Sequence, residues 1–319
     1  MRPVHASYYS REPENVGPVD RLAGKVQAVS GVQLDEGRES ENVEDRRGFP
    51  IGGRGAGLGC GGLLLLLLVS WLTGINPLRL LDMVQGGSPS TPASAPARPS
   101  GSNPTSGRAP QDTLGKFASV VLASTEDVWT DIFARSGRTY EKPRLVLFTG
   151  ATRSACGLAS AQVGPFYCEQ DRNVYVDLSF FQELSSRFGA SGDFADAYVI
   201  AHEIGHHVQN QLGLFGRIQR SRSDNAVSVR VELQADCYAG VWGFHANRDK
   251  HMIDPGDFEE GLRAAAAIGD DRLQKMSQGY VAPDSFTHGS SRERTGWLRR
   301  GLETGDPGRC DTFRGSPDQ

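Results

Sequence analysis

The chain lacks the patterns that mark several common classes of protein. Its five cysteines, Cys60, Cys156, Cys168, Cys237 and Cys310, form no C-x-x-C pair, which argues against a cysteine zinc knuckle or a thioredoxin-type redox motif. It has no strongly basic stripe, and its formal net charge of −4 argues against nucleic acid as a partner. Apolar residues make up 38% of the 319 residues, which is low for a compact globule. The composition therefore predicts that a good part of the chain is linker or tail.

A long uncharged stretch is present near the N-terminus. Between Arg54 and Arg79 lie 24 residues without a charge, including a run of six leucines at 63–68. A helix of that length covers roughly 36 Å, enough for a hydrocarbon core of about 30 Å. We therefore predict one transmembrane helix over residues 55–78. A cleaved signal peptide is the main alternative, and the long preceding segment and the lack of a small-x-small site directly after the run argue against it.

The basic residues around this run predict its orientation. Arg46, Arg47 and Arg54 precede the run, whereas Arg79 alone follows it closely. The positive-inside tendency then places residues 1–54 in the cytoplasm and the rest of the chain in the periplasm or outside the cell. The protein would be a single-pass protein of the cytoplasmic (inner) membrane. Residues 1–35 show no helical or strand pattern, and 37–50 are dense in charge, so we expect residues 1–54 to be largely disordered and solvated.

The remainder divides into a linker and a domain. Residues 79–111 are rich in Pro, Ser and Gly and should form a flexible tether. Residues 112–319 combine helical and strand patterns, as expected of a globular domain. We expect helices over 112–137 and 224–247 and from about 193, 257 and 290, with Asp224 as a cap. We expect a buried strand at 143–150 and a half-buried strand near 173–178.

The stretch "AHEIGHHVQNQLG" contains the pattern H-E-x-x-H, formed by His202, Glu203 and His206. On a helix, this spacing puts the two histidines one turn apart on one face, within reach of one metal ion. Zinc binds imidazole nitrogen readily, and a catalytic zinc keeps three protein ligands and a water. In this pattern the glutamate is the base that takes a proton from the metal-bound water. The alternative is a polar helix in which these residues fall by chance, and the surrounding apolar spacing favours the metal site.

A third ligand must come from elsewhere in the chain. The extended pattern H-E-x-x-H-x-x-G-x-x-H fails, because Gln209 and Leu212 stand where it needs Gly and His. In "VELQADCYAG", Glu232 and Asp236 lie four residues apart and share a helix face. Glu232 is our candidate third ligand, and Asp236 would accept a hydrogen bond from the free ring nitrogen of either histidine. A solvated acidic face is the alternative reading, and His245 and His288 are substitute ligands.

These motifs together resemble one bacterial family. The chain is similar to the bacterial membrane-anchored neutral zinc metallopeptidases in the two stretches above and in "SACGLASAQVGPFYC", "DLSFF", "AIGDDRLQ", "FTHGSSRERTGWLRRGLETGDPGRCDTF" and "SENVEDRRG". The resemblance covers about residues 38–313. It implies a zincin-type α+β domain with His202, His206 and Glu232 as ligands of one zinc ion and Glu203 as a catalytic residue.

The four cysteines of the expected external domain are candidates for disulfide bonds. Cys156 and Cys168 bracket a loop with Gly and Pro, and outside the cytoplasm they can pair. Cys237 and Cys310 would then form a second pair that ties the C-terminal tail to the helix carrying Glu232. Four buried free thiols are the alternative.

Two further features bear on catalysis and substrate binding. His288 is a candidate donor to the oxyanion that forms when water attacks a peptide carbonyl, or else it only orders its loop. Tyr280 is a weaker candidate for the same role, and we expect His207 to point away from the metal. The strand "NVYVDL" is a candidate edge for an extended peptide substrate. Asp270 and Asp271 are expected to form a turn.

The sequence thus predicts a membrane-tethered zinc endopeptidase that acts on polypeptide through metal-activated water and Glu203. Two alternatives belong to other classes. One is a non-catalytic membrane protein whose metal stabilises an interaction domain, and the other is a zinc hydrolase that acts on a non-peptide bond such as a cell-wall amide. A structural metal site has no use for a glutamate at position 203, which favours the peptidase.

Overall fold

The computed structural model describes residues 37–48, 109–161, 164–219, 224–250, 253 and 256–314. These residues form an α+β fold, which confirms the predicted class. None of the helices within these ranges is long and apolar enough to cross a membrane. The predicted span at 55–78 and the predicted disordered segment at 1–35 lie outside the described residues, as does most of the predicted linker.

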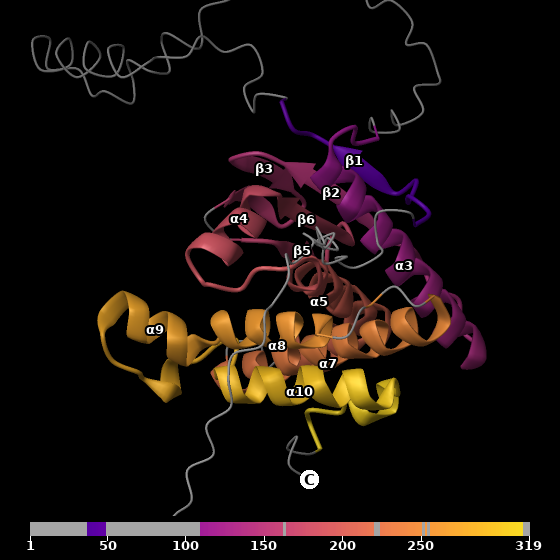
Figure 1. Cartoon of the computed structure of the whole chain (residues 1–319). Helices are drawn as coiled ribbons and strands as arrows, with labels where there is room; N and C mark the ends of the chain where they lie inside the picture. Colours follow the sequence, from indigo (N-terminus) through magenta and orange to yellow (C-terminus); the bar gives the residue numbers. More distant parts are fainter. Residues whose placement is uncertain are drawn as a thin grey trace, which may run out of the picture. The chain divides into compact units, whose positions relative to one another are not determined.

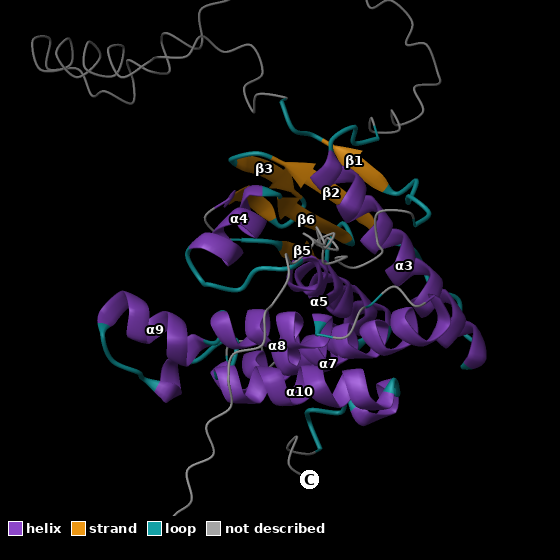
Figure 2. Ribbon diagram, viewed as in Figure 1, coloured by secondary structure: helices purple, strands orange, loops and turns teal. Residues whose placement is uncertain are grey.

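A mixed four-stranded sheet forms one layer of the described fold (Figures 1 and 2). Its strands are, in order across the sheet, β1 (Val43–Asp45), β2 (Arg144–Phe148), β6 (Asn173–Asp177) and β5 (Phe166–Cys168). The first three run parallel, and β5 pairs antiparallel with β6. A separate hairpin consists of β3 (Ala151–Ser154) and β4 (Gly157–Ser160). In this order β5 is an edge strand and β6 is an inner strand.

The inner position of β6 corrects two predictions. The strand is present where the sequence predicts it, but Val174 to Asp177 are all buried, so it is covered on both faces. Val174 and Val176 pack into the main core, while Tyr175 stacks on Phe166 at a ring-centroid distance of 4.8 Å on the other face. Because β2 and β5 flank it, this strand has no free edge for a peptide substrate. Strand order is set by long-range pairing, which the local pattern does not contain.

The helices pack mainly against each other. They are α3 (Thr113–Arg135), α4 (Ser179–Ser186), α5 (Asp193–Gln211), α6 (Leu214–Ile218), α7 (Asn225–Lys250), α8 (Asp257–Ala267), α9 (Asp270–Gln278) and α10 (Ser291–Thr304), with short 3-10 turns at Pro283–Ser285 and Pro307–Arg309. Helix α5 lies between the two layers: it contacts β5 and β6 on one side and α7 and α8 on the other (Figure 1). This central position explains why its residues 194–195 and 197–205 are all buried.

The helix boundaries follow local capping chemistry. The Asp224 carboxylate accepts a hydrogen bond from the Ala226 amide at 2.9 Å, which confirms it as the cap of α7. Ser290 caps α10 in a capping box with Glu293. The expected turn at Asp270 and Asp271 is instead the first turn of α9, where acidic side chains stabilise the helix N-terminus.

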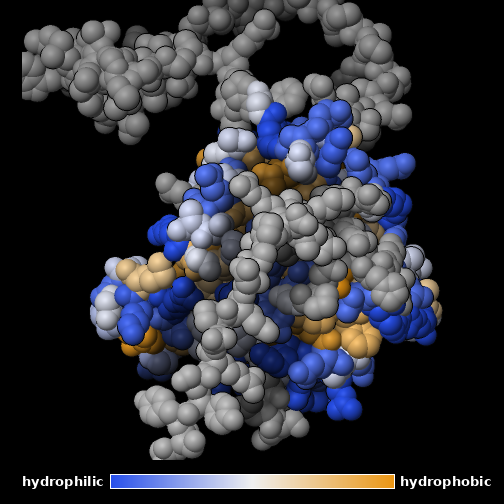
Figure 3. Space-filling model, in the orientation of Figure 1, coloured by the Kyte–Doolittle hydropathy of each residue, from blue (hydrophilic) through white to orange (hydrophobic). Residues whose placement is uncertain are grey.

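The charged segment before the predicted membrane span joins the sheet. β1 pairs in parallel with β2, and Val43 is only 5% exposed. Ser40 is also buried. The prediction that residues 37–50 are solvated is therefore wrong for this strand, and the folded unit includes residues that precede position 112. On the face shown in Figure 3, hydrophilic residues cover much of the surface near β1. Because two of the three residues of β1 are acidic, a hydropathy pattern does not reveal this strand.

Both predicted disulfide bonds are present. Cys156 bonds Cys168, with Cα atoms 5.8 Å apart, and Cys237 bonds Cys310, with Cα atoms 5.6 Å apart. The alternative of four free thiols is wrong. The first bond ties the β3–β4 hairpin to the edge strand β5. The second ties the C-terminal segment to α7.

Candidate metal centre

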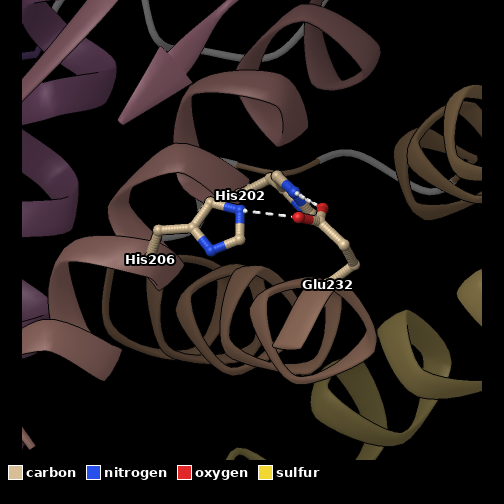
Figure 4. Close-up of side chains that lie close together, drawn as sticks. All are labelled: His202, His206 and Glu232. Carbon is tan, nitrogen blue, oxygen red and sulfur yellow. Dashed lines mark hydrogen bonds and ion pairs between the residues drawn. The ribbon is translucent and has the colours of Figure 1, made fainter. Parts of the chain in front are cut away.

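Helices α5 and α7 bring three potential metal ligands to one point. His202 and His206 lie one turn apart on α5, and Glu232 lies on the facing side of α7 (Figure 4). His202 Nε2 is 3.1 Å from Glu232 Oε2, and His206 Nε2 is 3.6 Å from Glu232 Oε1. One ligand atom from each residue lies within 4.8 Å of the other two. The structure therefore brings together the three residues that the sequence suggests as ligands.

Hydrogen bonds to the far side of each imidazole orient both rings. His202 Nδ1 lies 2.8 Å from Asp236 Oδ1, and His206 Nδ1 lies 2.9 Å from Gln209 Oε1. Because both partners accept, Nδ1 of each histidine carries a proton, and Nε2 is the ring nitrogen that faces Glu232 and can bind a metal ion once its own proton is lost. The Asp236 contact agrees with the sequence prediction and selects His202 as its partner.

The role of Gln209 is absent from the sequence prediction. Its side-chain amide donates to the Val231 carbonyl at 2.7 Å and to Gln234 Oε1 at 3.1 Å, which fixes its own oxygen toward His206. The sequence spacing does contain a signal for this contact, because residue 209 follows His206 by three positions and so lies on the same helix face.

A buried arginine neutralises the charge of Asp236. Arg294 of α10 donates from Nε to Asp236 Oδ2 and from Nη2 to Oδ1, both at 2.9 Å, and Tyr198 donates to Oδ1 at 2.6 Å. Burial alone would raise the pKa of Asp236, but Arg294 and His202 lower it to about 2. Burial likewise disfavours the charged form of His202, but Asp236 and Glu232 outweigh it and raise the pKa of His202 to about 10. Asp236 is therefore a fixed anion behind the first histidine.

Glu203 faces the same cleft as the three ligands. The cleft has a volume of about 790 Å³ and is lined by His202, Glu203, His206 and Glu232 together with apolar side chains. Glu203 is 7% exposed, and burial raises the pKa of its carboxyl above the ordinary value. A carboxyl in this setting can accept a proton from a water at the open side of the site.

His288 also lines this cleft. Its loop is held by Asp270, which accepts hydrogen bonds from the backbone N–H groups of Thr287, His288 and Gly289. The side-chain hydrogen bond to Asp270 raises the pKa of the His288 imidazole, which favours its protonated, donating form. Tyr280, the weaker candidate for the oxyanion donor, is 64% exposed and is not among the residues that line the cleft.

The other histidines considered have structural surroundings. His245 Nε2 lies 2.9 Å from the Gly305 carbonyl, away from the three ligands, so it is no substitute for Glu232. His207 points away from the cleft, as expected, and lies 2.7 Å from the Glu141 carbonyl and 3.1 Å from the Tyr167 hydroxyl. Burial lowers the pKa of His207 to about 4, so it packs as a neutral ring.

A glycine in the motif lets the two ligand-bearing helices approach each other. A Cβ atom on Gly205 would lie 2.9 Å from the Ala235 carbonyl oxygen and 3.0 Å from its Cα. Neither backbone atom can move without displacing α7, which carries Glu232. We therefore expect Gly205→Ala to weaken zinc binding about tenfold, a change of about 1.4 kcal/mol, as measured by competition with a chelating dye.

Gly216→Ala is the matched control, since no atom lies within 4 Å of its added Cβ. An equal zinc affinity for the Gly205→Ala variant and the parent protein would contradict the role of this close approach.

The donor set fits zinc. Two imidazole nitrogens and one carboxylate oxygen are a ligand combination of catalytic zinc sites. Hydrogen bonds at Nδ1 hold both rings with Nε2 toward Glu232, which is the orientation that ligation requires, and the site opens onto a cleft. The His–His–Glu group is therefore a candidate zinc site.

Comparison with known proteins gives the family. The chain belongs to the family described as "Putative neutral zinc metallopeptidase", whose model matches residues 32–313. It is 46% identical to the Escherichia coli (strain K12) protein YpfJ over 288 residues, which is 86% of this chain and 96% of that protein. It is also 46% identical over 201 residues to Mb2605 of Mycobacterium bovis and to Rv2575 of Mycobacterium tuberculosis, in each case 60% of this chain and 67% of the relative. Each of these three relatives is named as an uncharacterized protein. No solved structure matches the chain.

Proposed function

We propose that the protein is a zinc endopeptidase with one Zn²⁺ ion held by His202, His206 and Glu232. The observation that carries this proposal is the convergence of two imidazoles and a carboxylate beside a buried glutamate in an open cleft. Zinc, when bound, supplies a Lewis acid that polarises a carbonyl oxygen and makes water a nucleophile near neutral pH. Membership of a zinc metallopeptidase family supports the same reading. A zincin-like fold remains part of the proposal.

Side chains of the chain itself would carry the proton transfers. Glu203 is the general base: it takes the proton of the attacking water and passes it to the leaving amine. His288 donates a hydrogen bond to the carbonyl oxygen as negative charge develops on it. Asp236 and Gln209 keep the two imidazoles oriented.

An extended polypeptide is the substrate that the cleft suits. The edge strand β5, rather than the inner strand β6, carries the free edge, and its residues Phe166 and Tyr167 line the cleft. A peptide can pair with such an edge through its main chain. Apolar side chains that line the cleft, among them Phe188 and Phe215, would take apolar residues of the substrate.

We also propose that the domain acts outside the cytoplasm at a membrane surface. Two disulfide bonds support an oxidising compartment. The uncharged run at 55–78 supports attachment to the membrane.

Metal analysis combined with a digestion assay tests the proposed activity. The purified full chain should contain about one zinc ion per chain and should cleave an unfolded polypeptide at internal bonds. A chelator should abolish cleavage, and zinc should restore it. Zinc-loaded protein that leaves polypeptides intact but releases peptides from cell-wall material would replace the peptidase by the amide hydrolase. Inactivity on both, with a fourth protein ligand, would indicate a structural metal.

A further inference from the structure

The segment before the uncharged run shares a sheet with residues that follow the run. Three consecutive residue pairs join β1 to β2, from Val43 with Leu145 to Asp45 with Leu147. The Leu145 amide donates to the Asn42 carbonyl at 2.9 Å, and the Arg46 amide donates to the Leu147 carbonyl at 2.8 Å. Val43 belongs to the main hydrophobic core. The strand is therefore built into the domain.

A buried carboxylate on α3 takes its hydrogen bonds from this segment. The Glu126 side chain is 1% exposed. The Ser40 hydroxyl donates to it at 2.6 Å and the Asn42 amide at 2.7 Å, while Arg38 Nη2 lies 3.2 Å away. Lys142 adds a longer contact of 3.4 Å. A buried carboxylate needs such donors, so α3 and the segment depend on each other.

A bidentate ion pair joins the two flanks of the run directly. Arg47 Nη2 lies 2.5 Å from Asp112 Oδ2, and Arg47 Nη1 lies 3.1 Å from Oδ1. Asp112 is the cap of α3 and accepts a hydrogen bond from the Gly115 amide at 3.0 Å. The last residues of the segment thus contact the first residues of the second part of the domain.

We propose that residues 38–47 and residues 109–314 lie on the same side of the membrane that residues 55–78 are predicted to enter. A hydrocarbon core is about 30 Å thick, whereas paired strands are about 4.8 Å apart. A single crossing by residues 55–78 would put β1 and β2 on opposite sides. The charged partners exclude pairing within the hydrocarbon itself.

This topology replaces the predicted cytoplasmic position of residues 38–47. The positive-inside tendency is statistical, and it counts arginines here that are engaged elsewhere: Arg46 bonds Glu44, and Arg47 bonds Asp45 and Asp112. Since the same folded unit holds both disulfide bonds, the segment shares their compartment. The inference is independent of the proposed peptidase activity.

Thiol labelling in cells tests the topology. Glu41 and Glu303 are both exposed glutamates, one before and one after the run. In the full chain with Cys60→Ser, each is changed singly to cysteine and treated with a membrane-impermeant maleimide, before and after permeabilisation. We expect Glu41→Cys and Glu303→Cys to react under the same condition. Reaction of one only after permeabilisation, while the other reacts before it, would overturn the inference.

A charge exchange tests whether the segment is packed in the purified protein. Arg47→Asp should lower the melting temperature of the full chain by about 2 to 4 °C, because it places like charges beside Asp45 and Asp112. Adding Asp112→Arg should restore part of the loss. Purely additive effects of the two changes would show that the segment is detached, and the inference would fail.

Discussion

Glu203→Gln is expected to leave zinc bound at the parental stoichiometry and to abolish peptide hydrolysis. Glutamine keeps the size of the side chain but cannot accept a proton from water at neutral pH. General base catalysis typically contributes 10²–10⁴-fold, so we expect kcat to fall by about 10³-fold. Zinc content should not change, because the His–His–Glu group does not include Glu203. The measurements are metal content and the rate of cleavage of an unfolded polypeptide.

A control variant separates the loss of the base from a general loss of charge. Glu303→Gln makes the same chemical change at an exposed position on α10 and should retain parental activity. If Glu203→Gln still cleaves at the parental rate with full zinc, the assignment of the base is wrong. If it loses zinc as well, Glu203 supports the metal site instead of the proton transfer.

Arg294→Met is expected to be the most destabilising single substitution around the site. It leaves the Asp236 carboxylate, whose side chain has no exposed surface, without its cationic partner. Removing one partner of a buried ion pair costs about 3–5 kcal/mol. For a domain of this size, that corresponds to a fall in melting temperature of about 10 °C. Zinc affinity should also fall, by about 10–100-fold, because Arg294 holds in place the Asp236 carboxylate that orients His202.

Two further variants make this prediction specific. Arg299→Met removes an exposed arginine from the same helix and should leave melting temperature and zinc affinity unchanged. Adding Asp236→Asn to Arg294→Met removes the buried negative charge that has lost its arginine partner, and this should recover part of the melting temperature. Zinc affinity should stay low, because the carboxylate that accepts the hydrogen bond from His202 is gone. A double variant less stable than Arg294→Met alone would contradict the charge argument.

The parts of the site that could be predicted from sequence are those with helical spacing. His202 and His206 on one helix, and Glu232 and Asp236 on another, each share a face because their side chains are four residues apart. Arg294 could not be found in this way. It lies 58 residues from Asp236, and only the packing of α10 against α7 brings the two together.

The fold shows the same division between local and long-range information. Apolar spacing predicts α3 and α5 closely, because an amphipathic helix is encoded within its own residues. β1 cannot be predicted in this way, because two of its three residues are acidic and the strand gains its stability from pairing with β2, about 100 residues away. The edge position of β5 cannot be predicted from its local sequence, because strand order depends on the pairing of the whole sheet.

The bond between Cys237 and Cys310 has a consequence for the maturation of the protein. Cys237 directly follows Asp236 on α7, and Cys310 lies 73 residues further along the chain. A chain emerging from the ribosome or from a translocation channel holds both histidines and Glu232 well before it holds Arg294 and Cys310. The nascent protein therefore carries the candidate ligands before it carries Arg294 and Cys310, and we expect full zinc affinity only after the last part of the chain is present and the disulfide bond has formed.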